Sequence, residues 1–199
     1  MSPNLVRVSG LMAMLAGVLG IVLTPILSYL WATYSDTTYL YYGRAYFLVY
    51  LGCLLGLTGL YARRRGSQLK GENWGFGLTF AGLWIGLVGD ILAYWGGSPG
   101  KDFTQVQGTG FGIELLGLVL ILIGSVVLGV TYLDEQANVL PKLVAGLLIA
   151  AGPGGFLLFG LHAPSGTLLL FCCAWVVLGY LLLTGRILPA QPAMGQRTV

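Results

Sequence analysis

Six apolar stretches of about 20 residues follow one another along the chain, and they constrain its fold more than any other feature. A helix of about 20 apolar residues crosses the ~30 Å hydrocarbon core of a bilayer, where every backbone polar group must be hydrogen-bonded internally. The sequence therefore predicts an all-α polytopic membrane protein with a bundle of six transmembrane helices. The predicted spans are residues 8–32, 45–62, 74–96, 109–132, 142–162 and 166–185.

The remaining sequence is too short for a second domain. We predict a single transmembrane domain over residues 1–185 and a loose tail over 186–199, which contains Pro, Gly and Gln. Charged residues make up 9% of the chain, against about 25% in soluble domains. The first apolar run is longer than that of a signal peptide and has no cleavage motif, so we expect it to remain as the first span.

The distribution of Lys and Arg predicts the orientation. If both termini are cytoplasmic, eight basic residues lie on the inner side and only Arg44 and Lys101 on the outer side, as the positive-inside bias requires. The stretch "ARRRGSQLK" is the main topology anchor, and a lipid-headgroup site would need more basic residues. The basic residues of this anchor are Arg63, Arg64, Arg65 and Lys70.

Two prolines lie inside predicted spans, Pro25 in the first and Pro153 in the fifth. Proline removes a backbone donor and clashes with the preceding turn. We therefore expect both helices to be kinked or loosened at these positions.

The third span contains an acid in the stretch "GLWIGLVGD". Gly82, Gly86 and Asp90 follow one another at intervals of four residues, so they share one helix face. Gly82 and Gly86 form a small-xxx-small motif, which lets another helix pack closely. Asp90 is therefore expected to face a neighbouring helix rather than lipid.

The fourth span repeats this arrangement. Glu114 lies on one face with Gly110, Gly117 and Gly124. Both acids are expected roughly 8–10 Å below the outer interface, counted at 1.5 Å per residue. A short outer loop joins the two spans, so we expect the two carboxyl groups to meet.

Charges within a membrane are costly unless paired or hydrated, and they indicate a functional site by default. One hypothesis is an outward-facing polar pocket that binds a cation, relays protons or holds a polar ligand. Its candidate residues are Arg44, Asp90, Glu114 and His162. The alternative is a structural clasp in which the acids only fix the helix register. In this alternative His162 is a hydrated histidine at the membrane interface with no ligand role.

The segment 34–50, "YSDTTYLYYGRAYFLVY", is rich in tyrosine. Tyrosines gather at membrane interfaces, where one end of the ring is apolar and the other is wet. We interpret the segment as an interfacial belt, with a ligand-binding lip beside Arg44 as the alternative.

Motifs of known chemistry are absent from the sequence. It has no P-loop, H-E-x-x-H or dinucleotide fingerprint, and Cys53, Cys172 and Cys173 lack the spacing of a metal site. We therefore expect no cofactor, no metal and no nucleic acid partner, and the sequence argues against an enzyme without forbidding one.

The stretch "VLPKLVAGLLIAAGPGG" at 139–155 resembles a loop-to-helix pattern of small multi-span prokaryotic membrane proteins that have no assigned function. This resemblance covers under a tenth of the chain. It implies a prokaryotic protein of the inner or plasma membrane and no particular activity.

Three classes of function follow from the sequence. The first is an accessory or structural subunit that packs in the lipid bilayer against other membrane proteins or against itself as a homo-oligomer. The second is a small transporter or an ion or proton pathway that uses Asp90 and Glu114. The third, ranked last, is a membrane-embedded enzyme that uses the same acid pair.

Overall fold

The computed structural model describes residues 3–33, 36–65, 69–96, 105–133, 140–161 and 164–187. Within these ranges the chain consists of helices and short turns and contains no strand. The long helices are α1 (Pro3–Ala32), α3 (Phe47–Arg64), α4 (Lys70–Asp90), α5 (Gln105–Leu133), α6 (Lys142–Gly160) and α7 (Leu169–Leu183). The short elements are the helix α2 (Asp36–Arg44), the π-helical turn η1 (Ile91–Trp95) and the 3₁₀ turn η2 (Pro164–Leu168).

Six helical segments are long and apolar enough to cross a membrane, in agreement with the predicted all-α fold. The second begins earlier than expected, because the short helix α2 leads almost directly into α3. The six segments are Asn4–Leu30, Leu40–Arg64, Gly71–Trp95, Gln105–Leu133, Lys142–Gly160 and Gly166–Leu183.

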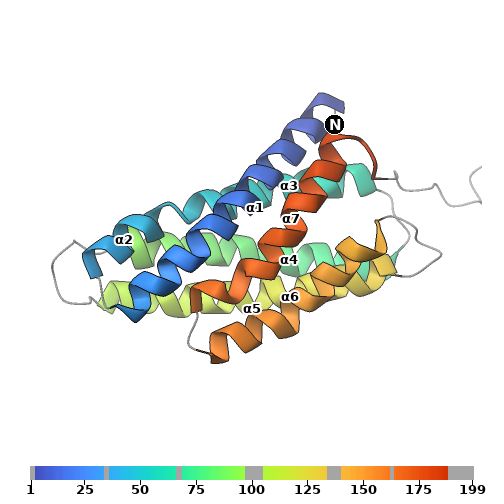
Figure 1. The fold of residues 1–199 in the computed structure, drawn as a ribbon. Coiled ribbons are helices and arrows are strands. Elements are labelled where there is room, and N and C mark those ends of the chain that lie inside the picture. Colours follow the sequence, from blue (N-terminus) through green and yellow to red (C-terminus); the bar gives the residue numbers. More distant parts are fainter. Residues whose placement is uncertain are drawn as a thin grey trace, which may run out of the picture.

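The six long helices form a closed ring in chain order. Each helix packs against the next one in the sequence, and α7 packs back against α1. The beginning of α1 and the end of α7 lie at the same end of the bundle (Figure 1), which we call the terminal end. The other end is the opposite end.

Both proline-containing helices continue through their prolines, Pro25 in α1 and Pro153 in α6. A change of helix type occurs in α4. The α-helical part of α4 stops at Asp90 and the chain continues as the π-helical turn η1. Such turns often occur at functional sites.

Large apolar side chains cover the outside of the bundle as well as its core. Leu15, Leu51, Leu116 and Leu157 are all exposed on different helices. A water-soluble bundle would carry polar residues on these outer faces. The surface and the helix lengths together suggest a multi-pass membrane protein.

The end of α7 is well packed. Gly185 has a left-handed φ of 70°, and the N–H of Arg186 donates to the carbonyl oxygen of Leu181 at 2.9 Å, as at many helix C-termini. Ile187 is buried. The tail predicted from residue 186 therefore starts with a packed residue, and residues 188–199 lie outside the described ranges.

Candidate functional site

Asp90 is the last residue of α4 and directly precedes the π-helical turn. Its side chain has 0% of its surface exposed. Within the described ranges, neither of its carboxyl oxygens has a hydrogen-bond partner. Buried polar groups are almost always hydrogen-bonded in proteins, so this side chain is an exception that requires an explanation.

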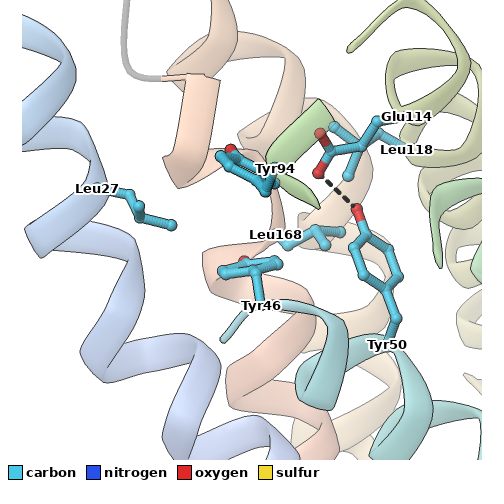
Figure 2. Close-up of a pocket in the computed structure, with 7 residues that line it drawn as sticks. All are labelled: Leu27, Tyr46, Tyr50, Tyr94, Glu114, Leu118 and Leu168. Carbon is cyan, nitrogen blue, oxygen red and sulfur yellow. Dashed lines mark hydrogen bonds between the residues drawn. The ribbon is translucent and has the colours of Figure 1, made fainter. Parts of the chain in front are cut away.

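Glu114 of α5 lies beside Asp90 and has a partner. The hydroxyl group of Tyr50, from α3, donates to Glu114 Oε1 at 3.1 Å (Figure 2). Tyr50 is fully buried. Asp90 and Glu114 interact electrostatically with each other, so the structure brings the two predicted acids into one cluster.

Close approach of the α4 and α5 backbones positions the two acids. A β-carbon added at Gly89 would collide with the backbone N and Cα of Glu114. One added at Gly82 would lie 2.7 Å from the carbonyl oxygen of Gly117. Side chains here would force the two helices apart, and the carboxyl groups would separate with them.

The other glycines singled out in the sequence also face neighbouring helices. A β-carbon at Gly110 would collide with the backbone of Ala93, and one at Gly124 would collide with Thr79. Gly86 faces α3 instead, where its β-carbon would lie 2.6 Å from the ring of Tyr50. Gly86 therefore leaves space for the tyrosine that bonds Glu114.

A small cavity of about 30 Å³ adjoins Glu114. This is room for about one or two water molecules. Three tyrosine rings and Glu114 provide its polar lining (Figure 2). The full set of lining residues is Leu27, Tyr46, Tyr50, Tyr94, Glu114, Leu118 and Leu168.

Sequence reasoning did not place the three tyrosines in the site. Tyr46 and Tyr50 belong to the segment interpreted as an interfacial belt, but both are buried and their rings lie 5.9 Å apart, edge to face. Their spacing of four residues puts them on one helix face, and this was the signal available in the sequence. Tyr94 lies in the π-helical turn.

Arg44 contacts Tyr94, one of the residues that line the cavity. Its Nε donates to the backbone carbonyl oxygen of Tyr94 at 3.0 Å. Its guanidinium also stacks over the rings of Tyr41 and Trp95, at 5.4 and 5.3 Å from their centroids. Arg44 thus contacts the backbone of a cavity-lining residue, whereas the fourth predicted pocket residue, His162, lies outside the described ranges.

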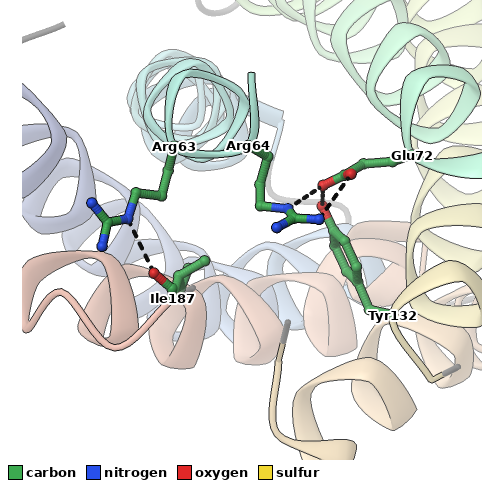
Figure 3. Close-up of polar contacts among 5 residues, drawn as sticks. All are labelled: Arg63, Arg64, Glu72, Tyr132 and Ile187. Carbon is green, nitrogen blue, oxygen red and sulfur yellow. Dashed lines mark hydrogen bonds and ion pairs between the residues drawn. The ribbon is translucent and has the colours of Figure 1, made fainter. Parts of the chain in front are cut away.

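A second polar cluster lies at the terminal end of the bundle. Arg64 of α3 donates to Glu72 of α4, from Nε to Oε1 at 2.8 Å and from a terminal nitrogen to Oε2 at 3.3 Å. The hydroxyl of Tyr132, from α5, donates to Glu72 Oε1 at 2.6 Å (Figure 3). Arg64 and Glu72 expose only 6% and 1% of their side chains.

This cluster changes the interpretation of the basic anchor. Arg64 is buried in an ion pair, so it does not reach the surrounding medium. Arg63 donates from Nε to the carbonyl oxygen of Ile187 at 3.0 Å (Figure 3). Arg65 is exposed, and the side chain of Lys70 lies outside what the structure describes.

The described residues contain no group of three or more His, Cys, Asp or Glu that could hold a metal ion. The three cysteines are free thiols in the helices. The acid cluster therefore offers two carboxyl groups and phenolic hydroxyls, which can bind and transfer protons or contact a small cation.

Comparison of the chain with protein-family models, curated proteins and solved structures finds no match. The candidate function therefore follows from the geometry of the site itself.

Proposed function

We propose that the chain is a multi-pass protein of a prokaryotic inner or plasma membrane with both termini in the cytoplasm. In this proposal Asp90 and Glu114 form the binding site for a proton or small cation on a transport pathway. The six long apolar helices support the membrane assignment, and the excess of basic residues at the terminal end supports the orientation.

The observation that carries the proposal is the unpartnered carboxyl group of Asp90. Both of its oxygens are buried without a hydrogen bond within the described residues. A structural clasp would satisfy the group, because an unsatisfied buried polar group costs about 1–3 kcal/mol. A site that binds and releases an ion gives a reason to keep such a group.

The second support is the position of the acids in the bundle. Asp90 lies at the junction of an α-helix and a π-helical turn, and Glu114 borders a cavity of about 30 Å³. Irregular backbone at membrane depth typically lines a polar cavity or an ion site. The small volume favours a proton or a small cation over an organic ligand.

Ion flux into liposomes tests this proposal. The protein is reconstituted, a proton or sodium gradient is imposed, and internal pH and sodium are followed with indicator dyes. We expect flux in the natural protein and in the control Glu135→Gln, which removes a carboxyl group outside the predicted spans. Asp90→Asn and Glu114→Gln should lose the flux while retaining the unfolding temperature.

A flux equal in all four proteins would contradict the role of the acids. The absence of both proton flux and sodium flux in the natural protein would contradict the transport proposal itself.

A second candidate function is an accessory subunit that packs against another membrane protein. A groove of about 630 Å³ between α3 and α4 favours it. Gly77 lies in this groove, and a β-carbon added there would meet nothing within 4 Å. The groove is lined by Leu57, Thr58, Tyr61, Asn73, Phe76, Gly77 and Phe80.

Most of the described glycines lie against other helices of the same chain. Gly82, Gly89 and Gly117 all face the partner helix in the α4–α5 contact. For this reason we place the accessory function second. Native mass spectrometry from the host membrane tests it: a stoichiometric partner that is lost in Gly77→Trp would support it, and a partner-free chain would contradict it.

A further inference from the structure

We infer that the ion held by this site is a proton, carried by Asp90 as a neutral carboxylic acid and exchanged through Glu114. This inference rests on the proposed function and names its substrate. It follows from the different surroundings of the two carboxyl groups.

The surroundings of Asp90 suit a neutral acid. Its side chain is completely buried, and no donor within the described ranges reaches either oxygen. The titratable groups that face it are Glu114 from α5 and Tyr50 from α3. Neither brings a positive charge, and a buried carboxylate without a donor or a cation is very unfavourable.

The surroundings of Glu114 suit the charged form. Its Oε1 accepts a hydrogen bond from Tyr50, and the side chain is only partly buried. It also borders the cavity, where a water molecule can solvate it. Two nearby acids in such different environments typically divide into one protonated and one ionised group.

The exchange step is balanced within the pair. The O–H bond of the Asp90 carboxylic acid breaks and an O–H bond forms at Glu114, the member of the pair that borders the cavity. The pair has a single negative charge before and after the transfer. Glu114 then releases the proton to water, and a proton that enters the pathway from water re-forms the O–H bond of Asp90.

A metal cation fits the site less well. Biological cations such as Mg²⁺ and Ca²⁺ take six or more oxygen ligands. The cavity of about 30 Å³ has one carboxylate and three phenol rings in its lining, and no three acidic, His or Cys side chains cluster in the described parts of the chain. A proton needs only one acceptor oxygen.

Infrared spectroscopy of the reconstituted protein at neutral pH tests the inference directly. A neutral carboxylic acid has a carbonyl band distinct from that of a carboxylate. We expect one such band in the natural protein, its loss in Asp90→Asn, and its retention in Glu114→Gln and in the control Glu135→Gln. A natural protein without the band would overturn the inference.

Chemical labelling of the natural protein provides a second measurement that requires no variant to fold. Dicyclohexylcarbodiimide is apolar and adds to neutral carboxylic acids, so the product keeps all atoms of both reactants. We expect one added reagent per chain, mapped by mass spectrometry to the peptide that contains Asp90. Labelling only at other acids would overturn the inference.

The two proposals fail in different ways. Sodium flux through a protein that lacks the neutral acid would overturn the proton inference and leave the transport function standing. A neutral acid at Asp90 in a protein that moves no ion would overturn the transport function alone.

Discussion

Helices α3, α4 and α5 contribute side chains to two polar clusters, one towards each end of the bundle. Glu72 and Asp90 are 18 residues apart on α4, or about 27 Å along the helix. The clusters are Arg64, Glu72 and Tyr132 at the terminal end, and Tyr50, Asp90 and Glu114 towards the opposite end.

The two clusters differ in how their charges are compensated. Glu72 accepts hydrogen bonds from Arg64 and from Tyr132. Asp90 is equally buried but has neither a cation nor a donor among the described residues. Glu72 is therefore paired within the fold, whereas Asp90 is buried without a pair, and in our proposal this unpaired carboxyl group binds the transported ion.

Breaking the paired cluster should have the largest effect on stability. Arg64→Met leaves Glu72 buried without its cation, and we expect a loss of about 3–5 kcal/mol in the free energy of unfolding. Unfolding in detergent measures it, and Arg65→Met, on the neighbouring exposed arginine, is the control. The double variant Arg64→Met/Glu72→Met should recover part of the loss. Equal stability of the Arg64 and Arg65 variants would show that the ion pair has no structural role.

Removal of the two tyrosine hydroxyls compares the clusters directly. Tyr132→Phe deletes a buried hydrogen bond to a charged group, at an expected cost of about 1.5–3 kcal/mol. Tyr50→Phe also deletes a bond to a charged acid in our inference, but this bond is 3.1 Å long and Glu114 is only partly buried. We therefore expect a smaller cost, of about 1 kcal/mol. The same unfolding measurement ranks them, and the reverse order would contradict the difference between the clusters.

The close contact between α4 and α5 lies between the two clusters, and one added methyl group should disturb it. In Gly82→Ala the new methyl group would lie 2.7 Å from backbone atoms of α5, so we expect a loss of about 1–3 kcal/mol from overpacking. Gly77→Ala, one and a half turns away on α4, meets nothing within 4 Å and should gain up to about 1 kcal/mol from helix propensity. Similar unfolding temperatures for both variants would argue against a close α4–α5 contact.

Neutralising the unpaired acid should have the smallest effect on stability. Asp90→Asn keeps the shape and removes no hydrogen bond, so the free energy of unfolding should change by less than about 1 kcal/mol. Detergent unfolding of this variant beside Arg64→Met provides the measurement. A loss as large as that of Arg64→Met would favour the structural clasp over the ion site.

The number of long apolar helices could be predicted from the sequence. The helix face on which each acid lies could be derived from residue spacing. Segment lengths follow from unbroken apolar runs, and the face of Asp90 follows from the glycine spacing on α4. These are local patterns with a fixed period, so they can be counted along a single helix.

The partners of the charged residues were harder to predict. Arg64 was interpreted only as an anchor because the positive-inside pattern is the same for a buried and an exposed arginine. Its partner Glu72 lies eight residues further on, across the connection between two helices, where the side-chain directions depend on how those helices meet. The π-helical turn after Asp90 contains no proline that would have predicted it. The two prolines that the sequence does place in spans lie inside the continuous helices α1 and α6.

The closed ring of helices has a consequence for how the chain is assembled during synthesis. In the proposed membrane setting, each helix that enters the bilayer can pack against the one made just before it, so five of the six contacts form between successive segments. The contact between α1 and α7 must wait until the last segment has been inserted. Until then the face of α1 that contains Gly10 and Gly17, which meets the backbone of α7 in the finished bundle, is open to lipid or to an assembly factor. The beginning of α1 and the end of α7 lie side by side. A circularly permuted chain that joins these two ends and has new termini in another connection should therefore form the same ring. In that chain a different helix pair would make the last contact.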